Sequence, residues 1–359
     1  MMVLKKLDNF RKVIMPNITQ NIGKSHYNKK VKGTELTDIK TVLICRPNQR
    51  LGNLLLLTPL IQEVVIMFPD VKIDLIVKGD LAKIVFKEYE NINSIMILPR
   101  KPFKEKLNYL KIFLSVKVKK YDLVINGDKG SSSGKILTYL SNAKYKIFGT
   151  LQSDLNFEDQ IHMAKNSVYN FRNYMRLIGK PSALNKIPDL NIKLTNLELL
   201  KGKEILENLV DYKYKPTIGV FTYATGTKCY SKDWWNEFYV KLQSEFEDTF
   251  NIIEIIPKEN VSQIDFKATS FYSDDIREIA SITANMKLVI AADSGIMHLA
   301  SASQVTTLGL FAVTNVQKYK PYNGLSDSID TTQTTIDDLL LSLNKKINTI
   351  MALQQELIF

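Results

Sequence analysis

Short apolar runs alternate with longer amphipathic segments along most of the chain. The runs predict buried strands at 41–46, 71–77, 95–98, 121–126, 144–148, 217–221, 251–256, 288–292 and 306–311. The segments between them repeat their apolar residues about every 3.6 positions, which predicts helices. These lie at 53–68, 81–89, 103–118, 135–141, 162–178, 198–210, 233–246, 276–284, 295–303 and 335–357. Pro59 predicts an irregularity in the first of them. Strands that alternate with helices indicate α/β structure, with parallel sheets covered on both faces.

The alternation occurs as two successive units, as expected for 359 residues at roughly 100–200 residues per domain. We expect a basic N-terminal extension at 1–38, a Rossmann-like domain at 39–190 and a second one, with a C-terminal helix, at 191–359. Two doubly wound domains that face each other would hold a ligand in the cleft beyond the carboxyl ends of their strands.

Composition narrows the class of protein. No apolar run approaches the roughly 18–20 residues of a spanning helix, and no secretory signal is recognisable. Cys45 and Cys229 are the only cysteines, too few for a disulfide framework or a cysteine metal cluster. We therefore expect a cytoplasmic protein.

Charge is distributed unevenly along the chain. Residues 1–150 hold 27 basic and 12 acidic side chains, a net charge of +15, whereas residues 151–359 hold 21 and 25, a net of −4. A basic face attracts nucleic acid, anionic lipid headgroups or phosphorylated substrates. The helix expected at 103–118 is rich in lysine, and we expect its stripe of Phe103, Leu107, Leu110 and Leu114 to pack on the sheet. Its lysines, with Lys119 and Lys120, would then attract an anionic membrane surface.

Arg46–Asn53 joins the first strand to the first helix and so lies at the carboxyl edge of the sheet. Gly52 lets a ligand or another backbone approach closely, and the helix start offers free amides. With one glycine it is neither a dinucleotide fingerprint nor a P-loop, and an ordinary turn would also explain it.

Asp293-Ser294-Gly295-Ile296-Met297-His298 follows a buried strand and opens a helix. Ser294 is a natural N-cap, and Gly295 frees the backbone. His298, one of only three histidines, falls one turn into the helix with its side chain directed back toward the start. Free amides, the helix dipole and an imidazole together suit a pyrophosphate.

A third segment runs from Thr225, Gly226, Thr227 and Lys228 to Lys232-Asp233-Trp234. Hydroxyls and a lysine at a helix start suit phosphate oxygens, and we select Thr225, Thr227 and Lys232 as ligands of the donor. Trp234 is interpreted as a core anchor beneath the helix.

Together these segments resemble glycosyltransferase family 9, the bacterial heptosyltransferases, from about Thr41 to about Asn315. Asp293–Ala300 resembles the family's Asp-Ser/Thr-Gly-x-x-His motif, and Lys232-Asp233-Trp234 resembles its Lys-x-Trp element. Arg50-Leu51-Gly52-Asn53 with Thr58-Pro59-Leu60 resembles its Leu-Gly-Asp…Thr-x-Pro element. The resemblance implies a GT-B fold, two Rossmann-like doubly wound domains facing a central cleft. It also implies inverting sugar transfer without an obligatory metal or other cofactor.

One departure from the family concerns the general base. Asn53 stands where the resemblance implies an Asp, and an amide cannot take a proton. Asp128, in a loop after a strand of the same domain, is the substitute we select, although a turn residue in Asn126-Gly127-Asp128 explains it as well.

We therefore expect an ADP-heptose-like donor bound by Thr225, Thr227, Lys232, Asp293, Ser294, Gly295 and His298. Arg50, Gly52 and Asn53 would face the acceptor, a lipid-linked saccharide of lipopolysaccharide type at the inner face of the cytoplasmic membrane. Asn53, Asp128 and Lys232 would form the catalytic group, with Lys232 stabilising the leaving diphosphate. The alternative is a catalytically impaired nucleotide-sugar or glycolipid-binding protein on the same fold. Nucleic-acid binding ranks last, because no recognisable motif accompanies the basic residues.

Overall fold

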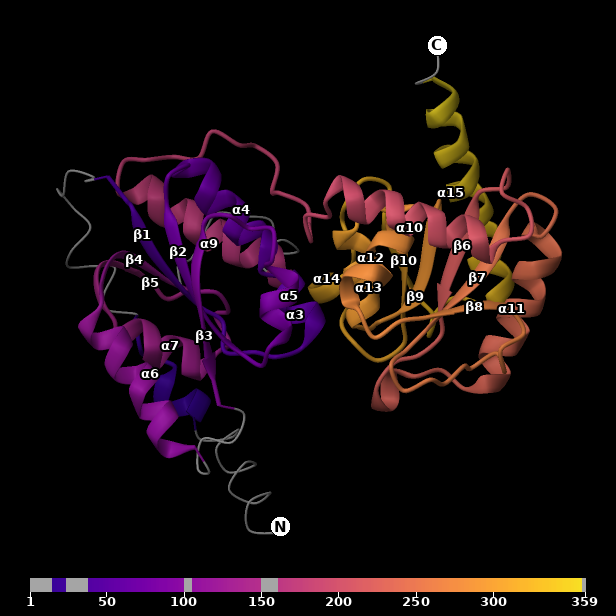
Figure 1. Ribbon diagram of the computed structural model, residues 1–359. Coiled ribbons are helices and arrows are strands. Elements are labelled where there is room, and N and C mark those ends of the chain that lie inside the picture. The colour runs from indigo at the N-terminus through magenta and orange to yellow at the C-terminus, as the bar shows by residue number, and fades with distance from the viewer. Residues whose placement is uncertain (1–14, 24–37, 100–104, 150–160, 357–359) are drawn as a thin grey trace, which may run out of the picture. The chain divides into compact units, whose positions relative to one another are not determined.

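The computed structural model describes residues 15–23, 38–99, 105–149 and 161–356 (Figure 1). The chain divides into two compact units, Met1–Pro188 and Asp189–Phe359. The sequence placed this boundary at 190/191. Each unit is a parallel sheet with helices, so the expected α/β fold of two Rossmann-like domains is confirmed.

The first unit contains a five-stranded parallel sheet in the order β3-β2-β1-β4-β5. Its strands are β1 (Thr41–Cys45), β2 (Lys72–Lys78), β3 (Ile92–Leu98), β4 (Lys120–Asn126) and β5 (Asn142–Ile147). The chain builds outward from β1 in one direction and from β4 in the other. The topological switch point, where ligands of such sheets bind, therefore lies between β1 and β4.

Helices cover this sheet: α3 (Leu51–Leu55), α4 (Thr58–Met67), α5 (Leu81–Val85), α6 (Lys106–Val118), α7 (Ser132–Leu140) and α9 (Met163–Leu177). The helix expected at 53–68 is in fact two helices. Pro59 lies in the first turn of α4, where its missing N–H costs nothing, and the irregularity falls just before it. Glu63 of α4 is fully buried and forms a two-point ion pair with Arg172 of α9, at 2.8 and 2.7 Å.

Part of the expected N-terminal extension packs on this unit. Residues 15–19 are helical, and buried Thr19 donates to Ser132 of α7 at 2.9 Å. Gly23 has a φ of +93° and lies against the ring of Phe148, where a side chain would not fit. The lysine-rich residues 1–14 and 24–37 lie outside the described part of the chain.

The expected packing of helix α6 is wrong. Leu107, Leu110 and Leu114 are 76%, 55% and 52% exposed, and Phe103 lies outside the described residues. The helix instead packs on the sheet through its opposite side, which carries Tyr109, Ile112, Phe113 and Val116. Both sides have helical spacing, so the sequence pattern alone could not choose between them.

The second unit contains a six-stranded parallel sheet in the order β11-β10-β9-β6-β7-β8. Its strands are β6 (Thr217–Phe221), β7 (Asn251–Ile256), β8 (Thr269–Tyr272), β9 (Leu288–Ala292), β10 (Thr306–Phe311) and β11 (Asp327–Asp330). The switch point lies between β6 and β9. The sequence did not predict β8 and β11, the two edge strands of four residues each.

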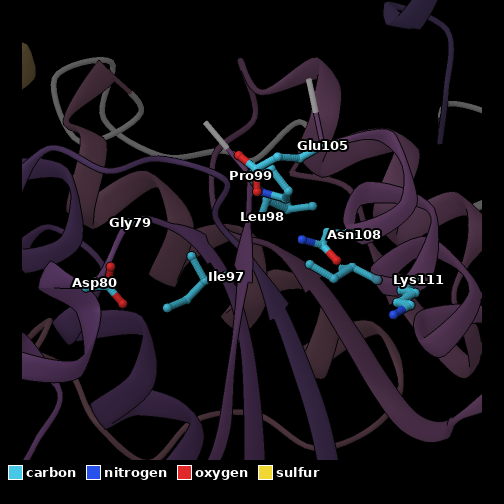
Figure 2. Close-up of a pocket in the computed structure, with 9 residues that line it drawn as sticks. Gly79, Asp80, Ile97, Leu98, Pro99, Glu105, Asn108 and Lys111 are labelled. Atoms are coloured by element: carbon cyan, nitrogen blue, oxygen red, sulfur yellow. The ribbon is translucent and has the colours of Figure 1, made fainter. Parts of the chain in front are cut away.

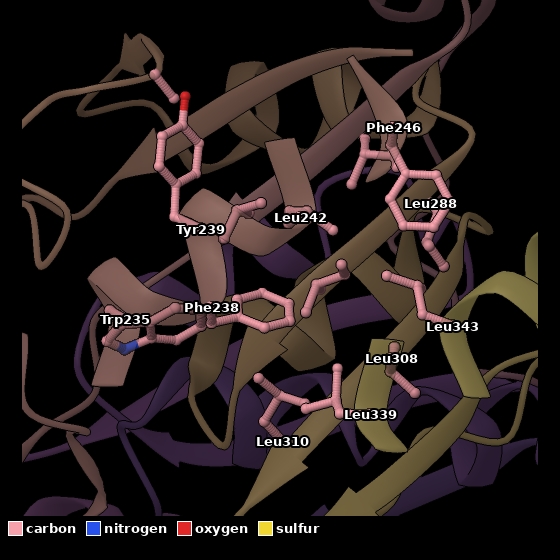
Figure 3. Close-up of a cluster of buried hydrophobic side chains, with 14 of the residues drawn as sticks. Trp235, Phe238, Tyr239, Leu242, Phe246, Leu288, Leu308, Leu310, Leu339 and Leu343 are labelled. Atoms are coloured by element: carbon pink, nitrogen blue, oxygen red, sulfur yellow. The ribbon is translucent and has the colours of Figure 1, made fainter. Parts of the chain in front are cut away.

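The helices of this unit are α10 (Asn196–Leu209), η1 (Gly226–Lys228), α11 (Lys232–Phe246), α12 (Ile276–Ala284), α13 (Gly295–Ala302), α14 (Val316–Tyr319) and α15 (Ile336–Glu356). Figure 3 shows the core between the sheet, α11 and α15, where Phe238 and Leu242 meet Leu308, Leu310 and Leu339. The core anchor of α11 is Trp235, which is fully buried, and not Trp234, which is only partly buried and stacks on Phe238.

Helices α10 and α12 are joined by a charged clamp. Thr195 and Glu198 form a capping box at the start of α10, and Glu198 also pairs with buried Arg277 of α12 at 2.6 and 2.7 Å. The Arg277 guanidinium lowers the pKa of Glu198 to about 2, because its effect outweighs that of burial, which raises the pKa. Gly202, one turn further along α10, lies directly against the backbone of Ser281. The clamp and the glycine together fix these two helices in close contact.

Candidate functional site

The switch point of the second unit brings Asp293 and Lys228 together. Asp293 follows β9, and its backbone amide donates to the carbonyl of Leu310 in β10 at 3.0 Å. The Lys228 ammonium, from η1 after β6, donates to the Asp293 carboxylate at 2.6 Å. The Asp293 side chain is 7% exposed and that of Lys228 is 34% exposed. A buried carboxylate therefore holds a lysine whose surface is still partly open to a ligand.

Helix α13 begins directly after Asp293. Ser294 is its N-cap and accepts a hydrogen bond from the amide of Met297 at 3.3 Å. The amides of Gly295 and Ile296 occupy the first two helical positions, which have no acceptor within the helix. These amides and the positive end of the helix dipole can bind an anion.

His298 lies one turn into α13 and is buried. Its ring meets Tyr319 of α14 edge to face, with centroids 6.2 Å apart. The Lys228 ammonium lies 5.8 Å from the centre of the same Tyr319 ring. Tyr319 therefore connects the imidazole with the Lys228–Asp293 ion pair.

Thr225 and Thr227 lie on either side of Gly226, which has a φ of +66°. All three residues are exposed at the loop that carries Lys228. The left-handed glycine reverses the chain there, so that the lysine returns toward β9.

Lys232 does not contact Asp293; its ammonium forms an ion pair with Asp265 in the loop after β7. Both side chains are about half exposed, at 56% and 52%, and Lys232 lowers the pKa of Asp265. Asp265 and the next residue, Phe266, have left-handed φ values of 55° and 58°. Lys232 thus belongs to a second polar group, distinct from the one built on Asp293.

A buried carboxylate holds that loop. Glu254 of β7 accepts hydrogen bonds from Thr222 at 2.6 Å and from Ser262 at 2.7 Å. The Ser262 hydroxyl in turn accepts from the amides of Ile264 and Phe266, at 3.1 and 3.0 Å. Burial raises the pKa of Glu254. Because Thr222 follows β6 and Ser262 follows β7, Glu254 joins these two loops, the second of which carries Asp265.

The switch point of the first unit is organised by Arg46, which directly follows β1. Its guanidinium is 4% exposed and donates to Asn53 Oδ1 at 3.0 Å and to a carboxylate oxygen of Asp128. Asn53 lies in α3, and Asp128 follows β4. The structure thus brings the two residues expected to surround the proton transfer onto one buried guanidinium.

Asp128 uses both carboxylate oxygens. Oδ2 accepts from Arg46, and Oδ1 accepts from the amide of Gly130 at 2.8 Å. Each oxygen accepts a single hydrogen bond, so the carboxylate keeps acceptor capacity with which it could take a proton from an acceptor hydroxyl. On the acceptor side, Gly52 is buried, whereas Arg50 is exposed and precedes α3 as its N-cap.

A cavity of about 410 Å³ lies elsewhere in the first unit, at the ends of β2 and β3 (Figure 2). Gly79 and Asp80 line it after β2, and Asn108, Lys111 and Ile112 line it from α6. None of the residues selected from the sequence lines this cavity.

Arg46 and Lys228 were inside segments singled out from the sequence but were not selected as site residues. A charged residue directly after a buried central strand was the available signal for Arg46. For Lys228 the signal was equivocal, because Lys232 offered the same charge four positions later. Only the fold shows which lysine reaches the strand end of Asp293.

Two features are absent from the residues that the structure describes. No helix among them is long and apolar enough to cross a membrane. Nor does any group of three or more His, Cys, Asp or Glu side chains lie together there as metal ligands would.

The match to a sequence family falls on the second unit. Residues 273–337 match the model of glycosyltransferase family 9 (heptosyltransferase). This segment includes Asp293, Ser294, Gly295, His298 and Tyr319. No curated protein matches the chain by sequence.

Solved structures extend the similarity to the whole fold. The glycosyl transferase family 9 structure from Veillonella parvula has a TM-score of 0.64 at 16% identity, covering 87% of this chain and 91% of its own. E. coli heptosyltransferase WaaC with ADP has a TM-score of 0.63 at 15% identity, with 85% and 99% covered. E. coli ADP-heptose LPS heptosyltransferase II has a TM-score of 0.58 at 14% identity, with 89% and 100% covered. The resemblance to glycosyltransferase family 9 is thereby confirmed in sequence over residues 273–337 and in fold over most of the chain.

Proposed function

We propose that this chain, which matches glycosyltransferase family 9 in its second unit and shares the fold of heptosyltransferases, is a glycosyltransferase. It would transfer a heptose or related sugar, with inversion, from a nucleotide-sugar donor to a lipopolysaccharide-type glycolipid. The observation that carries the proposal is the Lys228–Asp293 pair at the start of α13, inside the segment that matches the family.

The donor's diphosphate fits this place chemically. Lys228 offers a partly exposed ammonium, and the first amides of α13 point outward from the helix. As the bond between the anomeric carbon and the diphosphate oxygen breaks, negative charge grows on that oxygen. A fixed ammonium and helix amides stabilise this charge more in the transition state than in the bound donor.

Asp293 has a separate task. Its carboxylate orients Lys228 and, through its remaining acceptor capacity, can hold hydroxyls of the donor sugar. Thr225, Thr227 and Lys232 are exposed and lie close to Lys228 in the sequence. They would contact the outer part of the nucleotide.

The acceptor hydroxyl must lose its proton while its oxygen attacks the anomeric carbon from the side opposite the diphosphate. Asn53 cannot take that proton. Asp128 is the carboxylate beside it on Arg46, and in our proposal it takes the proton on a lone pair that its hydrogen bonds leave open.

Two features of the relatives support the finer substrate assignment. One neighbour is a heptosyltransferase with ADP, and another is an ADP-heptose LPS heptosyltransferase. An ADP-heptose-like donor, a lipid-linked saccharide acceptor and work at the inner face of the cytoplasmic membrane follow as proposals for this chain. We assign the reaction no metal.

The test is a panel of nucleotide sugars assayed for binding by calorimetry and for turnover. We expect ADP-linked sugars to bind, and Asp293→Ala to abolish transfer and weaken donor binding at least about tenfold while the thermal unfolding midpoint stays close to that of the parent. Unchanged affinity and turnover in Asp293→Ala would overturn the site. Donor binding without turnover on any acceptor would favour the alternative that Asn53 suggests, a sugar-nucleotide-binding protein.

A further inference from the structure

Helix α6 is apolar on two opposite sides. One side, with Tyr109, Ile112, Phe113 and Val116, packs against the sheet of the first unit. The other carries Leu107, Leu110, Leu114 and Val118, which are 76%, 55%, 52% and 77% exposed. We call these last four residues the outward stripe.

The outward stripe is continuous and bordered by lysines. At about 100° per residue, its four side chains fall within an arc of about 80°, and Lys117 and Lys111 lie about 20° beyond its two edges. Both lysines are exposed, and neither forms an ion pair with another described residue. No acidic residue occurs in α6; Glu105 precedes it.

We infer that the outward stripe of α6 is a lipid-docking face, on which the leucines enter the interfacial region of an anionic membrane and Lys111 and Lys117 contact its headgroups. A helix with large apolar side chains between lysines is suited to lie in the plane of a membrane surface. Lysine stems lie along the apolar layer while their ammonium groups reach the anionic lipids.

The charge on the border distinguishes lipid from a protein partner. A second apolar helix would cover the leucines equally well, but it would offer no negative charge to the two lysines beside it. An anionic bilayer supplies an apolar layer and negative charge at the same boundary. The inference rests on the proposed function and deepens it, since a lipid-linked acceptor would be reached from this surface. It adds insertion of the leucines to the attraction between lysines and anionic headgroups.

The lysine after α6 has a structural contact and is excluded from the test. Lys119 donates to buried Asp74 at 2.5 Å, and Tyr121 donates to the same carboxylate at 2.7 Å. Reversing the charge of Lys119 would remove the ion pair of buried Asp74 and bring a second carboxylate near it. Variants of Lys111 and Lys117 avoid this problem.

The experiment measures partition of the full-length protein onto vesicles of phosphatidylcholine alone and of phosphatidylcholine with phosphatidylglycerol, across a salt series. We expect binding to the anionic vesicles only, weakened but not lost at high salt because the leucines remain inserted. L107Q/L114Q should bind at least about tenfold more weakly, and should lose the salt-resistant part. K111E/K117E should also bind at least about tenfold more weakly at low salt.

The matched control is L197Q/L200Q, which replaces two leucines of α10 that are 76% and 66% exposed in the second unit. We expect this variant to bind vesicles like the parent. Sugar transfer to a water-soluble acceptor is measured in parallel, and it should be unchanged in all three variants, so that a failure of the proposed function is recognised separately. Vesicle binding that L107Q/L114Q leaves intact, equal binding to both vesicle types, or no binding would overturn the inference. So would a parent dimer that L107Q/L114Q converts to a monomer.

Discussion

At the scale of single residues, the two lysines that follow β6 differ in their partners. Lys228 is held by buried Asp293, whereas Lys232 pairs with Asp265 on the surface. We predict that Lys228→Ala lowers kcat about 100-fold, because it removes an ammonium that acts on developing charge. Lys232→Ala should lower kcat less than about fivefold, since an exposed ion pair contributes little. Steady-state kinetics on both variants decides between them, and a larger loss in Lys232→Ala would return the leaving-group role to that residue.

The shared contact with Arg46 allows a test of why a neutral residue stands at position 53. In the parent, the guanidinium is shared between one neutral amide and one carboxylate. Asn53→Asp places two carboxylates on it, and their mutual repulsion makes it easier for one of them to take a proton. We predict a change in kcat of at least about threefold and a shifted acidic limb in the pH–rate profile.

Asp128→Asn should lower kcat at least about 100-fold if Asp128 is the base, and Asn53→Asp should restore part of that activity in the double variant. An active Asp128→Asn single variant would contradict the assignment.

How much of the site could be predicted depended on what each residue type does locally. Asp293, Ser294 and His298 could be selected because an N-cap and a strand end leave local signals. Arg46 and Lys228 act on partners 82 and 65 positions away, a relation that no local pattern contains. The sequence therefore indicated the loops and left the pairing inside them to the fold.

At the scale of elements, predictability followed the strength of the pattern. Central strands such as β6, β7 and β9 were predicted at their observed bounds, because they are short and mostly apolar. The edge strands β8 and β11 are short and rich in hydroxyl and acidic side chains, which favour turns. Helix α6 was located correctly, but its orientation was wrong because apolar residues occupy both of its sides.

The contact between α10 and α12 depends on one glycine. A Cβ on Gly202 would lie 2.3 Å from the carbonyl carbon and oxygen of Ser281. Because both are backbone atoms of α12, the helices must separate to accommodate it. We predict that Gly202→Ala lowers the free energy of unfolding by about 2 kcal/mol, despite the better helix propensity of alanine. Lys203→Ala, at an exposed position of the same helix, is the control and should be neutral in a urea titration. A stabilised Gly202→Ala variant would contradict the packing.

At the scale of the whole molecule, the two units carry opposite charge. Residues 1–188 hold 32 basic and 15 acidic side chains, a net of +17, whereas residues 189–359 hold 16 and 22, a net of −6. A basic first unit suits an anionic acceptor at a lipid surface. The second unit, proposed to bind the anionic donor, has a net charge that repels it. Donor binding must therefore depend on local groups, the Lys228 ammonium and the amides of α13, and not on the field of the unit.

This division of charge makes the location of nucleotide binding a prediction. We expect ADP, added to the full-length protein, to slow amide hydrogen exchange at 223–230 and 294–299, where the ligand and the first turn of α13 would exclude water. Exchange at 46–53 and 126–131, around Arg46, should not change without an acceptor. Asp293→Ala supplies the control, because it leaves α13 in place but releases Lys228, and it should remove most of the protection at equal ADP concentration. Raising salt should weaken the protection only modestly, since partly buried groups are screened less than exposed ones. Protection confined to the first unit, or equal in Asp293→Ala, would show that the nucleotide binds somewhere other than the switch point between β6 and β9.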